Sequence, residues 1–337
     1  MNVAVLGLGF MGSTHLKAWR AVDANVAAIF SSDERKLAGD LSAIQGNLGG
    51  PGEKYDFSRV RKFTALEPLL EDDSIDAVDI CLPTHMHAEV AIEAMRSGKH
   101  VLVEKPMALD GPSADAMIEA ARKHNRVLMS AQVLRFMPVY EVLREALCGG
   151  DLGAARHATF RRRCAAPAWS TWLGDPVKSG GGVFDLLIHD VDMCLHLFGN
   201  PESVSATGYS APKNGVDVIT GELHYPGRGT VVVSGGWHHP KAYPFSMGYT
   251  VVADKGTIEY NSDGAGPTLY KLDGTSQALN APEKDGYRAE IEAFVNACRT
   301  GRAPAICPPE ESAAAVRLTR QMVDARNENG GRVPCKL

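Results

Sequence analysis

The sequence predicts an α/β domain built on a parallel sheet, followed by an α+β domain built on a large, mainly antiparallel sheet. Three observations lead to this prediction: the length of the chain, an alternation of strand and helix patterns near its start, and a succession of strands later on. Because 337 residues exceed what one hydrophobic core usually supports, two domains are expected. We assign them to residues 1–130 and 131–337.

The first domain is predicted from short β-branched runs that alternate with helical segments, the pattern of parallel strands joined by crossover helices. Helices are expected at residues 11–22 and 87–97, the second ended by Gly98. A Gly-rich segment at residues 46–54 is expected to be a surface loop. The strand-like runs are residues 3–6, 26–30, 77–81, 100–103 and 127–129.

The second domain is predicted from a change of pattern near residue 132. A helix at residues 138–147 and a strand at 156–163 precede a Gly-rich loop and helix at 179–197. Strands then follow one another without helices between them, which indicates antiparallel pairing. They are expected at residues 204–209, 217–225, 229–235, 248–253 and 256–261, before two amphipathic helices at 287–299 and 309–327.

Composition and charge limit the classes of partner. The formal net charge of -5 argues against a protein that binds a nucleic-acid backbone, which needs concentrated Lys and Arg. The 7 cysteines are scattered and form no C-x-x-C pair, so we expect reduced thiols and a cytoplasmic protein. No apolar stretch is long enough to span a bilayer, and we expect no membrane partner.

A G-x-G-x-x-G motif follows the first strand-like run directly and opens the first predicted helix. In that context the first glycine permits a tight turn, the second lets backbone amides approach a pyrophosphate, and the third lets the helix pack on the strand. The N-terminal end of the helix would then hold the anion. The context disfavours the alternative, a glycine turn without a ligand. The predicted cofactor residues here are Gly7, Gly9, Phe10, Met11 and Gly12.

The end of the second predicted strand bears on the choice between NAD and NADP. Proteins that bind NAD usually have an acidic residue there, which holds the ribose 2′-hydroxyl. Here Ser31 and Ser32 supply small hydroxyls, and Arg35 and Lys36 supply charge that suits a 2′-phosphate. We therefore favour NADP over NAD. In the alternative, Arg35 and Lys36 are solvated charges and Asp33 holds the ribose of NAD.

Three later stretches, at residues 82–87, 104–106 and 180–190, complete a series of motifs. Together with the Gly-rich turn, and in this order, they resemble those of the Gfo/Idh/MocA oxidoreductases, the family of glucose-fructose oxidoreductase and inositol dehydrogenase. The resemblance covers essentially the whole chain. It implies a Rossmann-type first domain and hydride transfer between NAD(P) and a secondary alcohol of a sugar, polyol or related compound.

Two other functions stay open at this point. Some relatives in this family use the oxidation transiently, so that an adjacent C–H bond becomes acidic and a glycosidic link is cleaved by elimination. A non-catalytic dinucleotide-binding protein is the third interpretation, which predicts loss of the catalytic residues. We further expect a homodimer or homotetramer formed through the sheet of the second domain.

Lys105 is expected at the C-terminal end of a buried parallel strand, the edge where open α/β sheets bind ligands. Pro106 favours an extended backbone at Lys105, so that the ammonium can project into a cleft. The resemblance implies that this lysine hydrogen-bonds the substrate hydroxyl that is oxidised. A salt bridge between Lys105 and Glu104 is the structural alternative.

Asp185 and His189 are four residues apart, so on an α-helix both side chains would share one face. Histidine suits proton exchange near neutrality, and a carboxylate can orient its ring. The resemblance implies that His189 takes the hydroxyl proton and that Asp185 positions substrate and histidine. A helix-start aspartate beside a core histidine is the alternative. No metal is expected, although His189, Asp192 and His196 lie on adjacent helical turns.

The resemblance also assigns cofactor residues beyond the Gly-rich turn. The loop after residue 81 is expected to line the nicotinamide ribose, while Thr84 would serve equally well as a helix N-cap. Gln132 lies where the chain of the family crosses between its domains beside the nicotinamide. The set comprises Leu82, Pro83, Thr84, His87, Glu104, Lys105 and Gln132.

Further side chains are candidates for substrate binding beside Lys105, Asp185 and His189. Arg135 lies at the predicted domain crossing, where an ion pair with an acid is an equally good interpretation. Trp172 and Trp237 suit stacking on sugar rings, with core or subunit-interface positions as the alternative. A neighbouring pair, Arg161 and Arg163, shares one face of a predicted strand and is expected to pair at a surface or interface, with contact to a carboxylate or phosphate of the substrate as the alternative.

Overall fold

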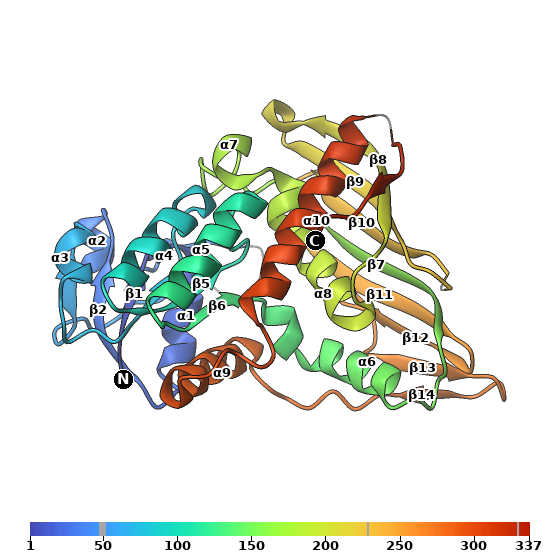
Figure 1. Ribbon diagram of the computed structural model, residues 1–337, viewed down its shortest axis with the longest axis horizontal. Coiled ribbons are helices and arrows are strands. Elements are labelled where there is room, and N and C mark those ends of the chain that lie inside the picture. Colours follow the sequence, from blue (N-terminus) through green and yellow to red (C-terminus); the bar gives the residue numbers. More distant parts are fainter. Residues whose placement is uncertain (47–51, 228, 329) are drawn as a thin grey trace. The chain divides into compact units, whose positions relative to one another are not determined.

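The computed structural model describes residues 1–46, 52–227, 229–328 and 330–337, and the chain divides into two compact units (Figure 1). Unit 1 comprises Met1–Val133 and Asp285–Ala313. Unit 2 comprises Leu134–Lys284 and Ala314–Leu337. The segment Asp285–Ala313 therefore belongs to unit 1, although it lies within residues 131–337, which the sequence assigned to the second domain.

Unit 1 contains a six-stranded parallel sheet with the strand order β3-β2-β1-β4-β5-β6. This order is that of dinucleotide-binding α/β domains, so the predicted parallel fold is confirmed. Strand β3 was not predicted, because two of its three residues are charged. The strands are β1 (Asn2–Leu6), β2 (Asn25–Phe30), β3 (Arg61–Phe63), β4 (Ala77–Ile80), β5 (His100–Glu104) and β6 (Leu128–Ala131).

Aspartate side chains cap three of the helices of unit 1. Asp110 accepts the Ser113 amide at the start of α5, and Asp285 accepts the amides of the first turn of α9. Helix α9 comes from the distant segment of the chain and packs against α1 (Figure 1). The helices are α1 (Phe10–Trp19), α2 (Glu34–Leu37), α3 (Glu67–Leu70), α4 (His87–Arg96), α5 (Gly111–Lys123) and α9 (Gly286–Thr300), with a 3-10 turn, η1, at Thr84–Met86.

The segment expected to be a surface loop at residues 46–54 falls partly outside the described residues, at positions 47–51. After that gap, the Gly52 amide donates to the carbonyl of Ile44, and Lys54 forms a bridge with Asp40. Gly46 lies against the ring of Phe10, since a Cβ added there would come within 2.1 Å of it.

Unit 2 contains a nine-stranded sheet with the order β14-β13-β12-β11-β7-β10-β9-β8-β15. Only the β7–β10 pair among these is parallel, so the predicted mainly antiparallel sheet is confirmed. The strands are β7 (Ala155–Ala165), β8 (Ser203–Ala211), β9 (Val216–His224), β10 (Val231–His239), β11 (Ser246–Ala253), β12 (Gly256–Asn261), β13 (Thr268–Lys271), β14 (Ser276–Ala278) and β15 (Val333–Pro334).

One face of the unit 2 sheet is covered by α8, which packs against β7 and β10. Residues 158, 160, 162 and 164 of β7 are buried on that face, in the alternation expected of a half-covered strand. The remaining helical segments are η2 (Val133–Phe136), α6 (Pro138–Cys148), α7 (Pro176–Ser179), the π-helical turn η3 (Val183–Leu187), α8 (Ile188–Phe198), η4 (Pro212–Asn214) and α10 (Pro309–Asn327). Within the described part of the chain, no helix is long and apolar enough to cross a bilayer.

Candidate active site

The Gly-rich turn joins β1 to α1 as the motif predicts. Gly7 has φ +97°, and a Cβ added there would lie 2.6 Å from the carbonyl oxygen of Cys81. A Cβ at Gly12 would lie 1.9 Å from the carbonyl oxygen of Gly7, so the third glycine is needed for the helix to pack on the strand. Gly9 faces open space and caps α1 without a side-chain hydrogen bond. Room therefore remains at this helix N-terminus for a phosphate group.

The segment after β2 is organised by Asp33, which caps α2. Asp33 Oδ1 accepts the amide of Arg35 at 2.9 Å, and the Asp33 amide donates to Ser31 Oγ at 3.1 Å. Arg35 Nη2 lies 3.6 Å from Asp33 Oδ2, and the Arg35 side chain is 84% exposed, so its guanidinium stays accessible to a ligand. Ser32 and Lys36 complete the predicted set, and Lys36 donates its backbone amide to Asp33 at 3.5 Å.

Four candidate segments share one edge of the unit 1 sheet. The Gly-rich turn follows β1, the loop with Leu82 and Pro83 follows β4, Lys105 follows β5 and Gln132 follows β6. Because these neighbouring strands are parallel, their C-terminal ends lie along the same edge. Gln132 is buried, and within the described residues neither atom of its side-chain amide has a hydrogen-bond partner. An unsatisfied amide at this edge fits a site that binds a polar ligand.

His87 connects two of these segments. Its Nδ1 lies 2.8 Å from the carbonyl oxygen of Pro106, and its Nε2 lies 2.7 Å from that of Leu82. Thr84 is buried and begins η1, whereas the N-cap position of α4 is occupied by Met86. His87 therefore braces the loop after β4 against the chain that follows Lys105.

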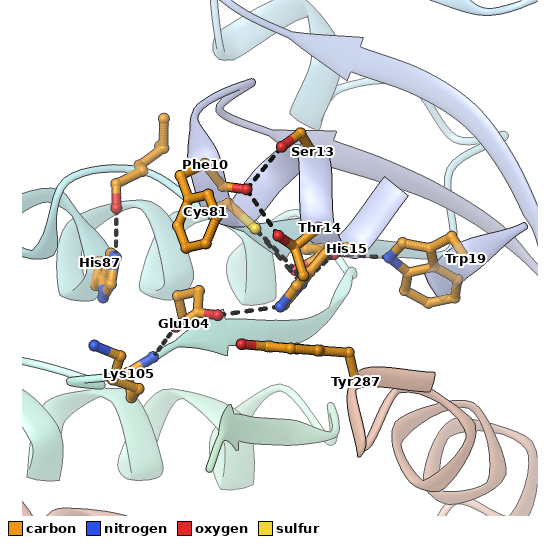
Figure 2. Close-up of polar contacts among 12 residues, drawn as sticks. Phe10, Ser13, Thr14, His15, Trp19, Cys81, His87, Glu104, Lys105 and Tyr287 are labelled. Carbon is orange, nitrogen blue, oxygen red and sulfur yellow. Dashed lines mark hydrogen bonds and ion pairs between the residues drawn. The ribbon is translucent and has the colours of Figure 1, made fainter. Parts of the chain in front are cut away.

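Lys105 directly follows a buried carboxylate. Glu104 is 5% exposed, and its Oε2 accepts the backbone amide of Lys105 at 2.9 Å. Figure 2 shows the side chain of Lys105 running away from Glu104, on the side where His87 lies. The carboxylate thus orients the backbone from which the ammonium projects.

Behind Glu104 lies a buried cluster that sequence reasoning missed (Figure 2). His15 of α1 is fully buried; its Nδ1 lies 2.9 Å from Asp79 Oδ2, and its Nε2 lies 3.1 Å from Glu104 Oε1. Trp19 Nε1 donates to Asp79 Oδ2 at 2.7 Å. Burial is the largest single influence and lowers the pKa of His15, but the charge of Asp79 and the polar contacts with Asp79 and Cys81 together outweigh it and raise that pKa well above its ordinary value. We call His15, Trp19, Asp79, Cys81 and Glu104 the His15 cluster.

The His15 cluster also includes the one set of three potential metal ligands among the described residues, His15, Asp79 and Cys81. Two observations favour hydrogen bonding there. Burial, followed by the charge of Asp79, raises the pKa of the Cys81 thiol far above its usual value, so the sulfur keeps its proton. Asp79 already accepts hydrogen bonds from Trp19 and His15.

In unit 2, Asp185 and His189 do not share one regular α-helix, as their four-residue spacing had suggested. Asp185 lies in the π-helical turn η3, whereas His189 lies in the first turn of α8. The Val183 amide donates to Asp217 Oδ2 at 2.9 Å, so β9 supplies the cap. A Cβ at Gly181 would lie 2.7 Å from Asp217 Oδ2, which shows that the loop passes too close for a side chain. A π-turn shifts the angular relation between the two residues from that of an α-helix.

Helix α8 is held by two buried ion pairs. Arg135 Nε and Nη2 donate to Asp192 at 2.8 and 2.7 Å, which is the ion pair that the sequence left as an alternative for Arg135. Arg162 Nε donates to Asp190 Oδ2 at 2.7 Å. The sequence had drawn attention to Arg161 and Arg163, but the residue between them is the one that faces the helix. These four charged side chains are at most 3% exposed.

The two tryptophans contribute to one apolar cluster of unit 2. Trp237 is 4% exposed and packs with Cys164 and Leu173, and Trp172 is partly buried against them. A Cβ at Gly182 would lie 2.6 Å from the indole of Trp237, so this ring face is covered by the glycine loop. Stacking of either indole on a sugar ring stays a prediction.

Comparison with known proteins identifies both parts of the chain. Residues 1–132 match a family described as "Oxidoreductase family, NAD-binding Rossmann fold". Residues 140–259 match the "GFO/IDH/MocA C-terminal domain". The D-xylose 1-dehydrogenase (NADP(+)) 2 of Haloferax volcanii is 31% identical over 326 residues, which cover 94% of each chain.

A second relative is known both by sequence and by structure. The UDP-N-acetylglucosamine 3-dehydrogenase of Acidithiobacillus ferrooxidans is 30% identical over 316 residues, with 91% of each chain covered. Its solved structure matches with a TM-score of 0.78 at 26% identity, over 96% of this chain and 97% of that one. Levoglucosan dehydrogenase in complex with NADH and levoglucosan has the same fold, with a TM-score of 0.85 at 19% identity over 100% of each chain.

Proposed function

This chain belongs to the Gfo/Idh/MocA family of NAD(P)-dependent oxidoreductases, and on that premise we propose that it oxidises a secondary alcohol of a sugar, polyol or related compound. The observation that carries the proposal is the shared sheet edge of unit 1. There the Gly-rich turn, Gln132 and Lys105 follow neighbouring parallel strands. The relatives supply the substrate class, since they are dehydrogenases of xylose and of a nucleotide sugar.

In this proposal three residues act on one substrate hydroxyl. Lys105 donates a hydrogen bond to the hydroxyl oxygen and stabilises the negative charge that develops as the C–H bond breaks. His189 accepts the hydroxyl proton, and Asp185 orients the imidazole and the substrate. A bound nicotinamide supplies the hydride acceptor. Arg135, Trp172 and Trp237 are proposed to shape the substrate side of unit 2, with Arg135 acting through its ion pair to Asp192.

Substitution of Lys105 tests this proposal. We expect Lys105→Met to lower kcat by about 100- to 1,000-fold, the typical weight of one group that stabilises a developing oxyanion. His189→Asn should give a similar loss. Formation of reduced nicotinamide is followed by absorbance with a panel of aldoses, inositols and glycosides, and Lys123→Met, at an exposed lysine of α5, serves as the matched control.

The same assay separates the other functions of this family. Cleavage of a glycoside without net reduction of the cofactor would indicate transient oxidation and elimination. Cofactor binding without single-turnover hydride transfer across the panel would indicate a binding protein. Hydride transfer that survives Lys105→Met unchanged contradicts the proposal.

We propose that NADP is the preferred cofactor. Asp33 is engaged as the cap of α2, while the exposed guanidinium of Arg35 and the hydroxyl of Ser32 suit a 2′-phosphate. We expect Arg35→Ala to raise the KM for NADP about 10-fold, the weight of one charge-assisted hydrogen bond, and to leave the KM for NAD nearly unchanged. Arg96→Ala, on α4, is the matched exposed control. An equal change for both cofactors would argue for NAD and for ribose binding by Asp33.

We propose that the protein forms a homodimer or homotetramer through the unit 2 sheet, and that it works in the cytoplasm. Tyr209, Val252 and Tyr270 are exposed large side chains on strands of this sheet. The pairing register places Val252 and Tyr270 on the face opposite Phe160, which α8 does not cover. None of the seven cysteines, all of which lie among the described residues, forms a disulfide, which suits a reducing compartment. Light scattering of the wild type and of Val252→Arg tests the assembly, which the arginine should weaken.

A further inference from the structure

The His15 cluster holds two buried carboxyl groups but only one basic side chain, the imidazole of His15. Asp79 and Glu104 are 0% and 5% exposed, and the imidazole of His15 contacts both of them. The other titratable groups that face His15 are the Cys81 thiol on β4 and Tyr287 on α9, whose ring centroid lies 6.2 Å from that of His15. Neither carries positive charge. Within this cluster, only a protonated imidazole balances the two carboxylates.

The contacts form a continuous chain from helix to strand end. His15 lies on α1, the helix that begins at the Gly-rich turn. Its Nδ1 meets Asp79 on β4, and its Nε2 meets one oxygen of Glu104 on β5. The other oxygen of Glu104 accepts the backbone amide of Lys105. One oxygen of Glu104 therefore lies at ion-pair distance from the imidazole, without hydrogen-bond geometry, and the other accepts the Lys105 amide (Figure 2).

We propose that His15 is a positioning residue for Lys105: its ring holds the Glu104 carboxylate, and that carboxylate fixes the backbone of the lysine. The inference rests on the role proposed for Lys105. It links the lysine to the helix whose N-terminus is proposed to bind the diphosphate. A shift of the β5 end would displace the ammonium from the substrate oxygen, and a misplacement of 1 Å costs about 100-fold in rate.

Loss of the imidazole proton, or of the ring, leaves two buried carboxylates without a cation. The Glu104 carboxylate then loses its ion-pair partner and can turn away from its present position. Its hold on the Lys105 amide weakens, because that hydrogen bond depends on the orientation of the carboxylate. The effect should appear in kcat, since the cofactor still binds at the Gly-rich turn.

Replacement of His15 by an uncharged side chain tests the proposal. We expect His15→Gln to lower kcat about 10-fold or more, while the dissociation constant of the reduced cofactor, measured by fluorescence, changes less than about 3-fold. The double variant His15→Gln/Glu104→Gln should recover part of the lost kcat, because a neutral amide needs no cation and still offers an acceptor oxygen. Fluorescence and circular dichroism define the folded fraction used to normalise each rate.

Trp19→Phe is the matched control. It removes the hydrogen bond to Asp79 on the side of the cluster away from Lys105 and keeps every charge. We expect it to lower stability and to leave kcat unchanged. A histidine with a purely structural role would behave like this control, so a normal kcat per folded His15→Gln protein overturns the proposal.

A further measurement does not depend on activity. In nitrogen-15 spectra at pH 7.5, both ring nitrogens of His15 should carry protons in the wild type. A neutral ring at that pH would also overturn the proposal. If Lys105→Met keeps full activity, the proposed function fails; if Lys105→Met is inactive while His15→Gln equals the wild type, the positioning role alone fails.

Discussion

The two units both carry buried charges next to a proposed catalytic residue, but their cations differ in kind. In unit 1 the imidazole of His15 contacts two acids, Asp79 and Glu104, behind Lys105. In unit 2 the guanidinium groups of Arg162 and Arg135 each pair with one aspartate of α8, the helix of His189. Arginine keeps its proton in proteins, whereas histidine can lose one near physiological pH.

This difference has a physical consequence for each unit. The bidentate Arg–Asp pairs of unit 2 are balanced one to one, so they fix α8 over the whole working range of pH. In the His15 cluster of unit 1, one imidazolium faces two carboxylates. The negative charge is therefore balanced only partly, and only while His15 is protonated. The support behind Lys105 is therefore the part that responds to pH.

The largest expected effect concerns the Arg162–Asp190 pair of unit 2. Arg162→Met leaves the fully buried Asp190 without its partner, which should lower the free energy of unfolding by about 3–5 kcal/mol. Urea denaturation measures the loss. Arg156→Met, on the same strand, removes a pair with Asp254 in which both side chains are at least 38% exposed, and it should have a much smaller effect. Equal losses would show that burial does not set the cost.

The next effect is the pH dependence that separates the two units. The folded-state pKa of His15 is raised above its unfolded value, so its stabilising contribution is fully present below pH 6.5, the usual value for histidine, and is lost as pH rises through the folded pKa. Wild type should therefore lose more stability than His15→Gln between neutral and alkaline pH. The urea midpoints of both proteins are measured across that range. Their difference at each pH reports on His15, because the titrations that the two proteins share cancel. Parallel curves for the two proteins would contradict this sign.

Much of the fold could be predicted from periodicity, because long strands bury regular sets of apolar residues. The strands missed were β3, β13, β14 and β15, which are short and largely exposed and so carry little apolar pattern. The assignment of Asp285–Ala313 to unit 1 could not be read from the sequence either. It depends on the packing of α9 against α1, a contact between distant segments.

The candidate site divides in the same way. Motifs located the Gly-rich turn and Lys105, because local geometry demands those residue types at fixed positions. The His15 cluster depends on contacts between residues 64 positions apart in the sequence, which no local pattern contains. A signal was nevertheless present, since Asp79 is the one charged residue in the strand AVDI. The alternation of side chains along β7 likewise placed Arg162 on the other face of the strand from Arg161 and Arg163. It could not indicate which of the two faces α8 covers.

The smallest expected effects concern the neutral groups that complete each cluster. Trp19 Nε1 donates to the carboxyl group of Asp79 at 2.7 Å, whereas the Tyr140 hydroxyl accepts from Arg162 Nη2 at 3.2 Å. Trp19→Phe should lower the free energy of unfolding by about 2 kcal/mol and Tyr140→Phe by about 1 kcal/mol, both measured by urea denaturation. The order follows from the charge balance. Asp79 shares one cation with Glu104 and depends on its neutral donor, while Arg162 already has a carboxylate of its own. A larger loss for Tyr140→Phe than for Trp19→Phe would contradict this account of the charge balance.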